Sequence, residues 1–348
     1  MIALPDSFHL PEIVTRLPHA CHRDCAELDA RSAAFARPYL RSYFGDVDRT
    51  ERYLRQRIPH YGCLAYPDTL GDRTVDLVNL MMGVTIYDDT FSRPGIQFDS
   101  AATTRLHERW CQVFDGDRPP DEPAHRFVHD VITAAEARMT PHLARRSRQA
   151  WREMADSHLA EAVRRQNGIT LDPDRYMSER LTNVYGWWIT THVEYALGID
   201  LGELAAAPEI RAVRARAIAH IALVNDLYSF AKELDLEEAM NLILVLLHRD
   251  NLNLQDAVDT VVALIHQAEA DFVADCDVVR AGPLGSRSEI RAYLDGIAYT
   301  MTGNLRWSQL STRYHGDQHD GGLVTRGTIS LTPRPTIYSP SRREFDDD

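Results

Sequence analysis

Lysine is almost absent from this sequence, because Lys232 is the only one in 348 residues. The 38 basic residues are outnumbered by 51 acidic ones, which gives a formal net charge of −13. No basic stripe stands out, so nucleic acid is not expected as a partner. An uninterrupted apolar run of about 18 residues, the minimum for a membrane-spanning helix, is also missing, so no membrane span is predicted.

Cysteine is scarce as well. An odd, scattered set fits a reducing cytoplasm better than a disulfide scaffold, and the first residues lack the regions of a secretory signal, so the expected location is cytoplasmic. Cys21, His22 and Cys25, with His19, could mimic half of a zinc site. No second ligand pair follows them in the sequence, so we favour chance spacing. The five cysteines are Cys21, Cys25, Cys63, Cys111 and Cys276.

Strand patterns with a period of two residues are nearly absent, which leaves an all-α fold as the prediction. Residues 1–20 are expected to form an extended arm. From Gly316 onward the composition shifts to Thr, Pro, Ser and Arg, which predicts a disordered tail over 316–348. The helical patterns cover about 24–61 (broken near Pro38 and at 44–46), 69–90, 100–115, 124–138, 141–167, 173–197, 208–248, 254–280 and 287–313.

The most informative stretch runs from Asn225 to Glu233, in the middle of the 208–248 segment. On a helix, Asn225, Ser229 and Glu233 share one face. Their amide, hydroxyl and carboxylate oxygens are ligands that suit Mg²⁺. A solvated face of an amphipathic helix is the alternative. The flanking segments 217–224 and 241–247 are apolar nearly all round, however, which indicates a buried helix whose polar groups need partners.

Three other places carry candidate chemistry. Asp88 and Asp89 end an apolar helix, where the helix dipole disfavours carboxylates and a bound cation would compensate. Arg180 precedes an aromatic run, and guanidinium is well suited to gripping phosphate. Arg313 and Tyr314 could donate to the same anion. A polar loop, a surface arginine and an ordinary helix terminus, respectively, remain the alternatives from the local residues alone.

Taken in order, these motifs resemble the bacterial class I terpene synthases. Asn225-Asp226-x-x-Ser229-x-x-x-Glu233, with its Lys-Glu ending, is similar to the family's second metal-binding motif, and Asp88-Asp89 stands where its aspartate-rich motif lies. Arg180 is 45 residues before Asn225, as is the family's diphosphate-sensing arginine. Asn183 and Val184 fall at its linker and effector positions. Trp307 followed by Arg313-Tyr314 resembles its C-terminal motif, and Phe8-His9-Leu10-Pro11 with Pro18-His19 resembles its N-terminal arm.

One departure concerns the aspartate-rich motif. The family usually has another acidic residue three or four positions after the second aspartate, but Ser92 and Arg93 stand there. The resemblance therefore gives Asp88 most of the metal binding in this motif.

The resemblance covers about residues 8–315 and implies a single helical domain over 21–315, built around a central apolar cavity. It implies a lyase that uses Mg²⁺, expected as three ions, to ionise a prenyl diphosphate and cyclise the carbocation. Farnesyl diphosphate is the favoured substrate, with geranylgeranyl diphosphate as the alternative, and the resemblance alone suggests a homodimer. The implied metal ligands are Asp88, Asp89, Asn225, Ser229 and Glu233; the diphosphate donors are Arg180, Lys232, Arg313 and Tyr314; the other catalytic positions are Asn183, Val184 and Trp307.

Aromatic side chains could stabilise the carbocation by about 0.5–2 kcal/mol each. The candidates are Phe91, Trp187, Trp188, Tyr299 and Trp307, with ordinary core packing as the alternative for each. A chain-elongating prenyl transferase would show a second aspartate-rich motif in place of Asn225-Asp226. A catalytically silent helical binding protein is the competing class, and the retained Asn225, Ser229 and Glu233 speak against it.

Overall fold

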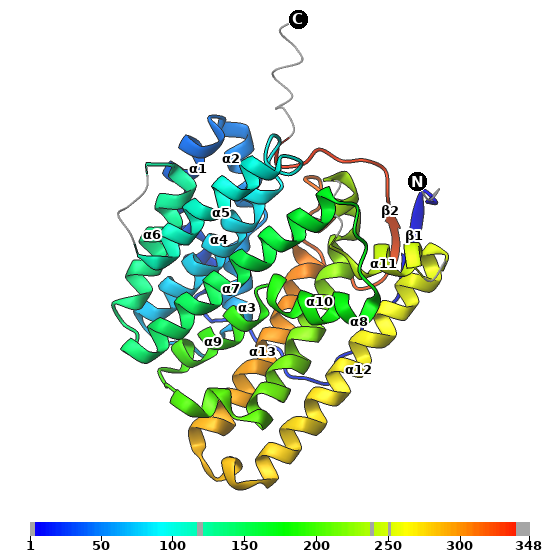
Figure 1. The fold of residues 1–348 in the computed structure, drawn as a ribbon. Helices are drawn as coiled ribbons and strands as arrows, with labels where there is room; N and C mark the ends of the chain where they lie inside the picture. The colour runs from blue at the N-terminus through cyan, green and yellow to red at the C-terminus, as the bar shows by residue number, and fades with distance from the viewer. Residues whose placement is uncertain (1–3, 117–120, 237–239, 250–251, 339–348) are drawn as a thin grey trace, which may run out of the picture.

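The computed structural model describes residues 4–116, 121–236, 240–249 and 252–338, and these are mostly helical (Figure 1). The all-α prediction is therefore confirmed. Two short strands, β1 (Ser7–Leu10) and β2 (Gly327–Ser330), pair antiparallel. The helices are α1 (Cys25–Phe44), α2 (Val47–Arg55), α3 (Ile58–Ala65), α4 (Asp72–Phe91), α5 (Ser100–Asp115), α6 (Pro123–Glu136), α7 (Pro141–Gln166), α8 (Pro173–Asn183), α9 (Gly186–Leu197), η1 (Gly202–Ala206), α10 (Pro208–Asp235), α11 (Leu242–Arg249), α12 (Leu254–Ala281), η2 (Pro283–Ser286), α13 (Ser288–Leu310) and α14 (Thr312–His315).

Helix α10 lies in the middle of the bundle (Figure 1). It packs most extensively against α12 and α13, and also against α8 and α9. Its side chains are buried on nearly every face from Ala217 to Ala231. This burial explains why its sequence is apolar all round outside the Asn225–Glu233 motif.

Several helix starts follow directly from local chemistry. Thr140 and Asp172 accept hydrogen bonds from backbone N–H groups in the first turns of α7 and α8. Each is followed by a proline, which needs no partner for a backbone N–H at the first helical position. These starts agree with the predicted ones within a residue.

The predicted helix over 173–197 is wrong, because the chain breaks between α8 and α9. Tyr185 adopts left-handed backbone angles (φ 52°) at the break. At Gly186 a β-carbon would lie 2.0 Å from Cγ2 of Ile218, so only glycine lets α9 approach α10 so closely. The break sets α8 apart as a separate short helix beside the middle of α10.

The predicted helix over 208–248 is also wrong, because α10 ends at Asp235 and α11 begins at Leu242. The Asp226 carboxylate accepts a hydrogen bond from the backbone N–H of Leu242 (3.0 Å), and Asn241 donates to the Asp226 carbonyl (2.7 Å). These bonds hold the returning chain against α10. The break expected near Pro38 is absent, since α1 continues through it with Ala36 and Leu40 buried on either side.

The prediction of a disordered tail over 316–348 does not hold for 316–338; residues 339–348 lie outside the described part. Strand β2 pairs with β1, and Arg52 forms an ion pair with Asp317 at 3.0 Å. Arg334 donates to the Tyr314 carbonyl, and Tyr338 to the Asp89 carbonyl. The polar composition that predicted disorder supplies these side-chain contacts instead.

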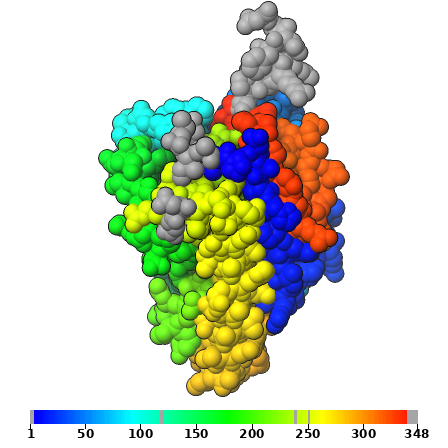
Figure 2. Space-filling view, turned by 90° about the vertical axis from the view of Figure 1, so that its right-hand side faces the viewer, coloured from blue at the N-terminus to red at the C-terminus, as the bar shows by residue number. Residues whose placement is uncertain are grey.

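The N-terminal arm lies along α12 (Figure 2, blue beside yellow). The backbone of His9 exchanges two hydrogen bonds with the Gln255 amide, at 2.8 and 2.9 Å. Further along, the backbone N–H of Arg16 donates to Glu269 at 2.8 Å. The described helices include none that combines the length and apolarity needed to cross a membrane.

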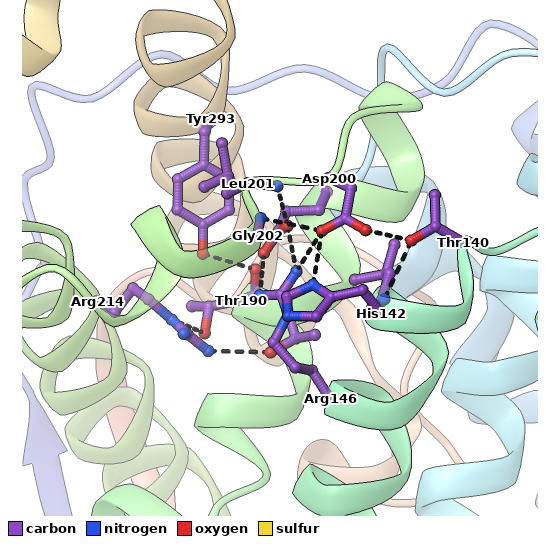
Figure 3. A network of polar contacts seen from close by, with 12 residues as sticks. Thr140, His142, Arg146, Thr190, Asp200, Leu201, Gly202, Arg214 and Tyr293 are labelled. Carbon is purple, nitrogen blue, oxygen red and sulfur yellow. Dashed lines mark hydrogen bonds and ion pairs between the residues drawn. The ribbon is translucent and has the colours of Figure 1, made fainter.

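A polar network ties α7 to α9 and to the turn before η1 (Figure 3). Arg146 of α7 donates two hydrogen bonds to Glu194, whose carboxylate is fully buried, and one to Asp200 at 3.1 Å. The backbone N–H of Leu201 completes the partners of Glu194 at 2.8 Å. Removing one partner of such a buried ion pair costs about 3–5 kcal/mol, so this network fixes the geometry at this part of the bundle.

Candidate active site

A cleft opens between α4, α7, α8, α10 and the end of α13. It contains about 840 Å³ of space free of atoms, counted together with its open mouth. The structure brings most of the predicted site residues to its wall: Asp88, Phe91, Arg180, Asn183, Val184, Asn225, Ser229, Lys232, Glu233, Trp307, Arg313 and Tyr314.

The shared face of Asn225, Ser229 and Glu233 points into this cleft as the helical spacing predicted. Ser229 is 1% exposed, and within the described residues its Oγ has no hydrogen-bond partner. A buried hydroxyl without a partner is costly, so a ligand atom at this point would relieve it. Glu233 is held from behind by the Asn241 amide at 2.8 Å.

Arg180 is held in place by several partners. Its guanidinium donates to Oδ1 of Asp226 at 2.7 and 3.0 Å, to Asn183 Oδ1 at 2.6 Å and to Asn225 Oδ1 at 2.8 Å. Burial alone would lower the pKa of Arg180, but the Asp226 carboxylate raises it well above its usual value. The arginine therefore stays a fixed positive charge at the cleft wall.

The two adjacent aspartates do different things. Asp88 lines the cleft with 40% of its side chain exposed. The surrounding protein still removes part of the water that would solvate its charge, which raises its pKa although His158 opposes the rise. Asp89 is turned away and buried, with its carboxylate bound by Arg313 at 2.8 Å and by the Tyr53 hydroxyl at 2.9 Å. The structure thus places Asp88, and not Asp89, with the other predicted metal ligands. A step of about 100° between neighbouring helix positions is the physical reason.

Arg313 and Tyr314 enter the cleft from α14, beside the end of α13. Burial raises the pKa of Tyr314, which keeps its hydroxyl protonated, and that hydroxyl accepts a hydrogen bond from Asn225 Nδ2 at 3.0 Å. Trp307 stacks on Tyr61 with ring centroids 5.2 Å apart, and its indole N–H donates to the Arg57 carbonyl at 3.2 Å. These contacts fix one aromatic face at the cleft.

Only two of the five aromatic candidates, Phe91 and Trp307, line the cleft. The prediction is wrong for Trp187, which lies under Arg214 with 5.0 Å from the guanidinium to the ring centre, and for Tyr299, which lines a separate small hollow between α9 and α13. Trp188 is fully buried and packs on Trp151 and His192. Trp187 and Trp188 follow the break between α8 and α9. Sequence spacing does not show which way side chains face beside such a break, and this explains why neither tryptophan lines the cleft as expected.

We did not predict His158, Glu161 and Arg165, which line the cleft from α7. Their spacing of three and four residues puts them on one face, which was the available signal. His158 Nε2 lies 3.6 Å from Asp88 and 3.2 Å from the Asn183 carbonyl, and Glu161 accepts from the Asn183 amide at 2.8 Å. The motif predicted no separate role for Asp226, yet its carboxylate binds Arg180.

The donors at the cleft fit a hard divalent cation. Asp88, Ser229 and Glu233 offer a carboxylate, a hydroxyl and a second carboxylate, and Asn225 an amide oxygen, all oxygen ligands of the type that Mg²⁺ prefers. Arg180, Lys232 and Arg313 surround them with positive charge, which suits an anion bound together with the metal.

Known proteins similar in sequence are terpene synthases. The family described as "Terpene synthase family 2, C-terminal metal binding" matches residues 79–271. Microbial Terpene synthase-like protein 13 of Selaginella moellendorffii is 24% identical over 96% of this chain and 95% of its own. The (+)-T-muurolol synthase ((2E,6E)-farnesyl diphosphate cyclizing) of Roseiflexus castenholzii is 26% identical over 78% and 85%.

The fold agrees as well. The crystal structure of germacradien-4-ol synthase from Streptomyces citricolor superposes with a TM-score of 0.73, at 19% identity, over 86% of this chain and 98% of that one. At this identity the similarity speaks for the fold, and it confirms the class I terpenoid synthase architecture. Because the family match spans more than half of the sequence and includes both the aspartate pair and the α10 motif, this chain belongs to the terpene synthase family.

Proposed function

We propose that this protein is a Mg²⁺-dependent terpene cyclase, a carbon–oxygen lyase that ionises a linear prenyl diphosphate and releases diphosphate. The observation that carries the proposal is the convergence of three oxygen donors, Asn225, Ser229 and Glu233, on the face of α10 that lines the cleft. The Ser229 Oγ is buried without a partner among the described residues, and it differs from other such hydroxyls, for example that of Ser32, because it lies in the cleft between two further oxygen donors.

Asn225, Ser229 and Glu233 would hold Mg²⁺ on one side of the cleft and Asp88 on the other. The resemblance to the family suggests three ions. When bound, the ions supply positive charge that stabilises diphosphate as a leaving group. Asp89 stays with Arg313 in this proposal and contributes by orienting that guanidinium.

The chain's own donors complete the anion site. Arg180, Lys232, Arg313 and Tyr314 stand where they can donate to diphosphate oxygens. Because Asp226 and Asp89 already fix the two arginines, little reorganisation is needed as charge develops on the departing oxygen. No side chain has to act as a nucleophile, since cleavage of the allylic C–O bond leaves a delocalised cation.

Behind the polar mouth, the cleft must keep water from the carbocation. Phe91 and Trp307 are the aromatic faces available there, and Trp307 is held rigidly by Tyr61 and the Arg57 carbonyl. Asn183 and Val184 end α8 beside the left-handed Tyr185, so substrate binding at Arg180 would act directly on this strained turn.

Farnesyl diphosphate is the proposed substrate and a sesquiterpene the proposed product. The support is the similarity to the T-muurolol synthase, whose name gives farnesyl diphosphate as the molecule it cyclises. Geranylgeranyl diphosphate, with a diterpene product, is the alternative substrate.

The test is incubation of the purified protein with Mg²⁺ and the C10, C15 and C20 diphosphates in separate reactions. Products are read by gas chromatography–mass spectrometry and released diphosphate by a colorimetric assay. We expect a cyclic C15 product that disappears with EDTA, returns with excess Mg²⁺ and is lost in Glu233→Gln. A C20 product would correct the substrate, and no diphosphate release from any of the three would refute the enzyme in favour of a silent binding protein.

A further inference from the structure

A second group of metal-binding side chains lies outside the cleft, where the N-terminal arm enters α1. The Sγ atoms of Cys21 and Cys25 and a ring nitrogen of His60 all lie within 4.8 Å of one another. Cys21 Sγ and His60 Nε2 are 3.9 Å apart. The sequence offers no second ligand pair after Cys21 and Cys25, but the fold brings one from α3, since Cys63 stands one turn after His60.

Cys63 adjoins this group through Cys25. Cys21 contacts His60, and Cys25 and Cys63 belong to one small buried cluster with Leu28 and Val78. His60 and Cys63 are spaced three residues apart on α3 and so share a face. The backbone also fixes the pairing, because the N–H of His22 donates to the Cys63 carbonyl at 2.9 Å.

This geometry is close to that of a tetrahedral zinc site. With Zn–S near 2.3 Å and Zn–N near 2.0–2.1 Å, neighbouring ligand atoms of a tetrahedral ion lie about 3.5–4 Å apart. The Cys21–His60 distance already falls in this range. Thiolate and imidazole ligands favour zinc over the Mg²⁺ that suits the oxygen-lined cleft.

We propose that Cys21, Cys25 and His60, with Cys63 as the fourth ligand, form a structural zinc site that is separate from the active site. Cys63 and Cys25 are buried, whereas Cys21 is exposed, so an ion can enter from solvent on the Cys21 side. Binding would release the thiol protons and fasten the start of α1 to α3.

The site would also support the cleft. His60 precedes Tyr61, the residue that stacks on Trp307, and the Arg57 carbonyl that holds the Trp307 indole begins the same helix. An ion at His60 would thus stiffen the helix that carries Tyr61.

The first experiment measures metal without any substrate. The protein is purified with a thiol-free reductant, and its zinc content is measured by inductively coupled plasma mass spectrometry. Apo-protein is then titrated with Co²⁺, whose charge-transfer and d–d absorption reports thiolate ligands and tetrahedral geometry. We expect one equivalent per chain and a higher melting temperature for the zinc form than for the apo form.

Variants decide the ligand set. Cys25→Ser and His60→Gln should lower zinc affinity by more than the roughly 10–100-fold that loss of an outer partner costs. Cys63→Ser should weaken the thiolate charge-transfer band, and an unchanged spectrum would remove Cys63 from the set. His19→Gln and Cys276→Ser are the matched controls, since His19 is exposed near the site and Cys276 is buried in α12 away from it. The controls should bind zinc as the parent does.

Two results would overturn the proposal. One is a reduced protein that takes up no zinc or Co²⁺ at equimolar concentration. The other is a Cys21–Cys25 disulfide in the native protein, shown by an intact mass lower by two hydrogen atoms and by two fewer titratable thiols. Neither result depends on whether the cleft turns over a prenyl diphosphate, so this inference and the proposed function fail separately.

Discussion

At the scale of single residues, the informative signal is a side chain whose surroundings do not satisfy it. Ser229 is buried without a partner, whereas Asp226, equally buried, is bonded to Arg180, Tyr176 and the backbone of Leu242. Because Ser229 also lines the cleft between Asn225 and Glu233, it indicates a ligand site, whereas Asp226 is a residue that positions others. Sequence spacing put both on α10 but could not separate these roles.

Ser229→Ala tests the first role. Because the buried Oγ makes no hydrogen bond with the described residues, its removal should not lower the free energy of unfolding and should raise it by up to about 1–3 kcal/mol. Loss of an outer-shell partner of a metal costs about 10–100-fold, so loss of this ligand should lower turnover at least about 10-fold and raise the Mg²⁺ needed. Mg²⁺ titrations of steady-state turnover measure both effects.

Ser32→Ala is the matched control for this variant. Ser32 Oγ in α1 is also buried without a partner in the described part of the chain, but it does not line the cleft. Its Mg²⁺ dependence should equal that of the parent. Equal Mg²⁺ curves for the parent and Ser229→Ala would contradict the ligand assignment.

The same substitution at the adjacent residues Asp88 and Asp89 should affect turnover in one case and stability in the other. Asp88→Asn should abolish turnover with little change in melting temperature, because this side chain faces the open cleft. Asp89→Asn should destabilise the fold by about 3–5 kcal/mol, because it removes the partner of a buried arginine. Thermal unfolding and turnover are measured on both proteins; a stable Asp89→Asn that has lost Mg²⁺ dependence would restore Asp89 as a metal ligand.

At the scale of elements, most helices were predictable and the breaks were not. Apolar periodicity and capping residues gave α4, α5, α6, α7 and α12 within a few residues at each end. The break at Tyr185–Gly186 depends on a contact with Ile218, which is distant in sequence, and the end of α10 depends on Asp226 binding the returning chain. Both breaks place site residues, so local rules fail where function constrains the backbone.

The Gly186 contact can be tested directly. Gly186→Ala should cost about 1–3 kcal/mol, since its β-carbon would overlap Ile218 Cγ2 at 2.0 Å. In the background of Ile218→Ala the same change should cost much less, so a double-mutant cycle in chemical denaturation should show a coupling of about 1 kcal/mol or more. Strictly additive effects would show that the glycine is needed for another reason.

At the scale of the whole molecule, the cleft is assembled from segments far apart in the chain. The spacing on α10 predicted which side chains face together, but only the fold shows that α7 adds His158 and Glu161 to the cleft. Only the fold shows, too, that Arg334 and Tyr338 donate hydrogen bonds to the backbone carbonyls of Tyr314 and Asp89. Composition could not predict an ordered C-terminal segment, because its order comes from pairing with β1, more than 300 residues earlier.

Burial of histidine gives a prediction for the stability of the whole fold. Burial lowers the pKa of His220 to about 3 and that of His192 to about 4, from an ordinary value of 6.5. Between these values the unfolded chain binds protons that the folded chain does not, so stability is complete above pH 6.5 and falls as the pH drops toward 3. At pH 5 each histidine should subtract about 2 kcal/mol from the free energy of unfolding relative to neutral pH.

His220→Leu isolates one of these contributions, because neither ring nitrogen of His220 has a hydrogen-bond partner among the described residues. The variant should bind about one proton fewer on unfolding at pH 5, which lowers the slope of unfolding free energy against pH by about 1.4 kcal/mol per pH unit. Urea denaturation from pH 4.5 to 7.5 gives that slope for the variant and the parent. An unchanged slope would mean that His220 is protonated in the folded protein. Since His220 lies on α10 five residues before Asn225, it would also mean that water reaches this part of the helix more than its sequence and burial indicate.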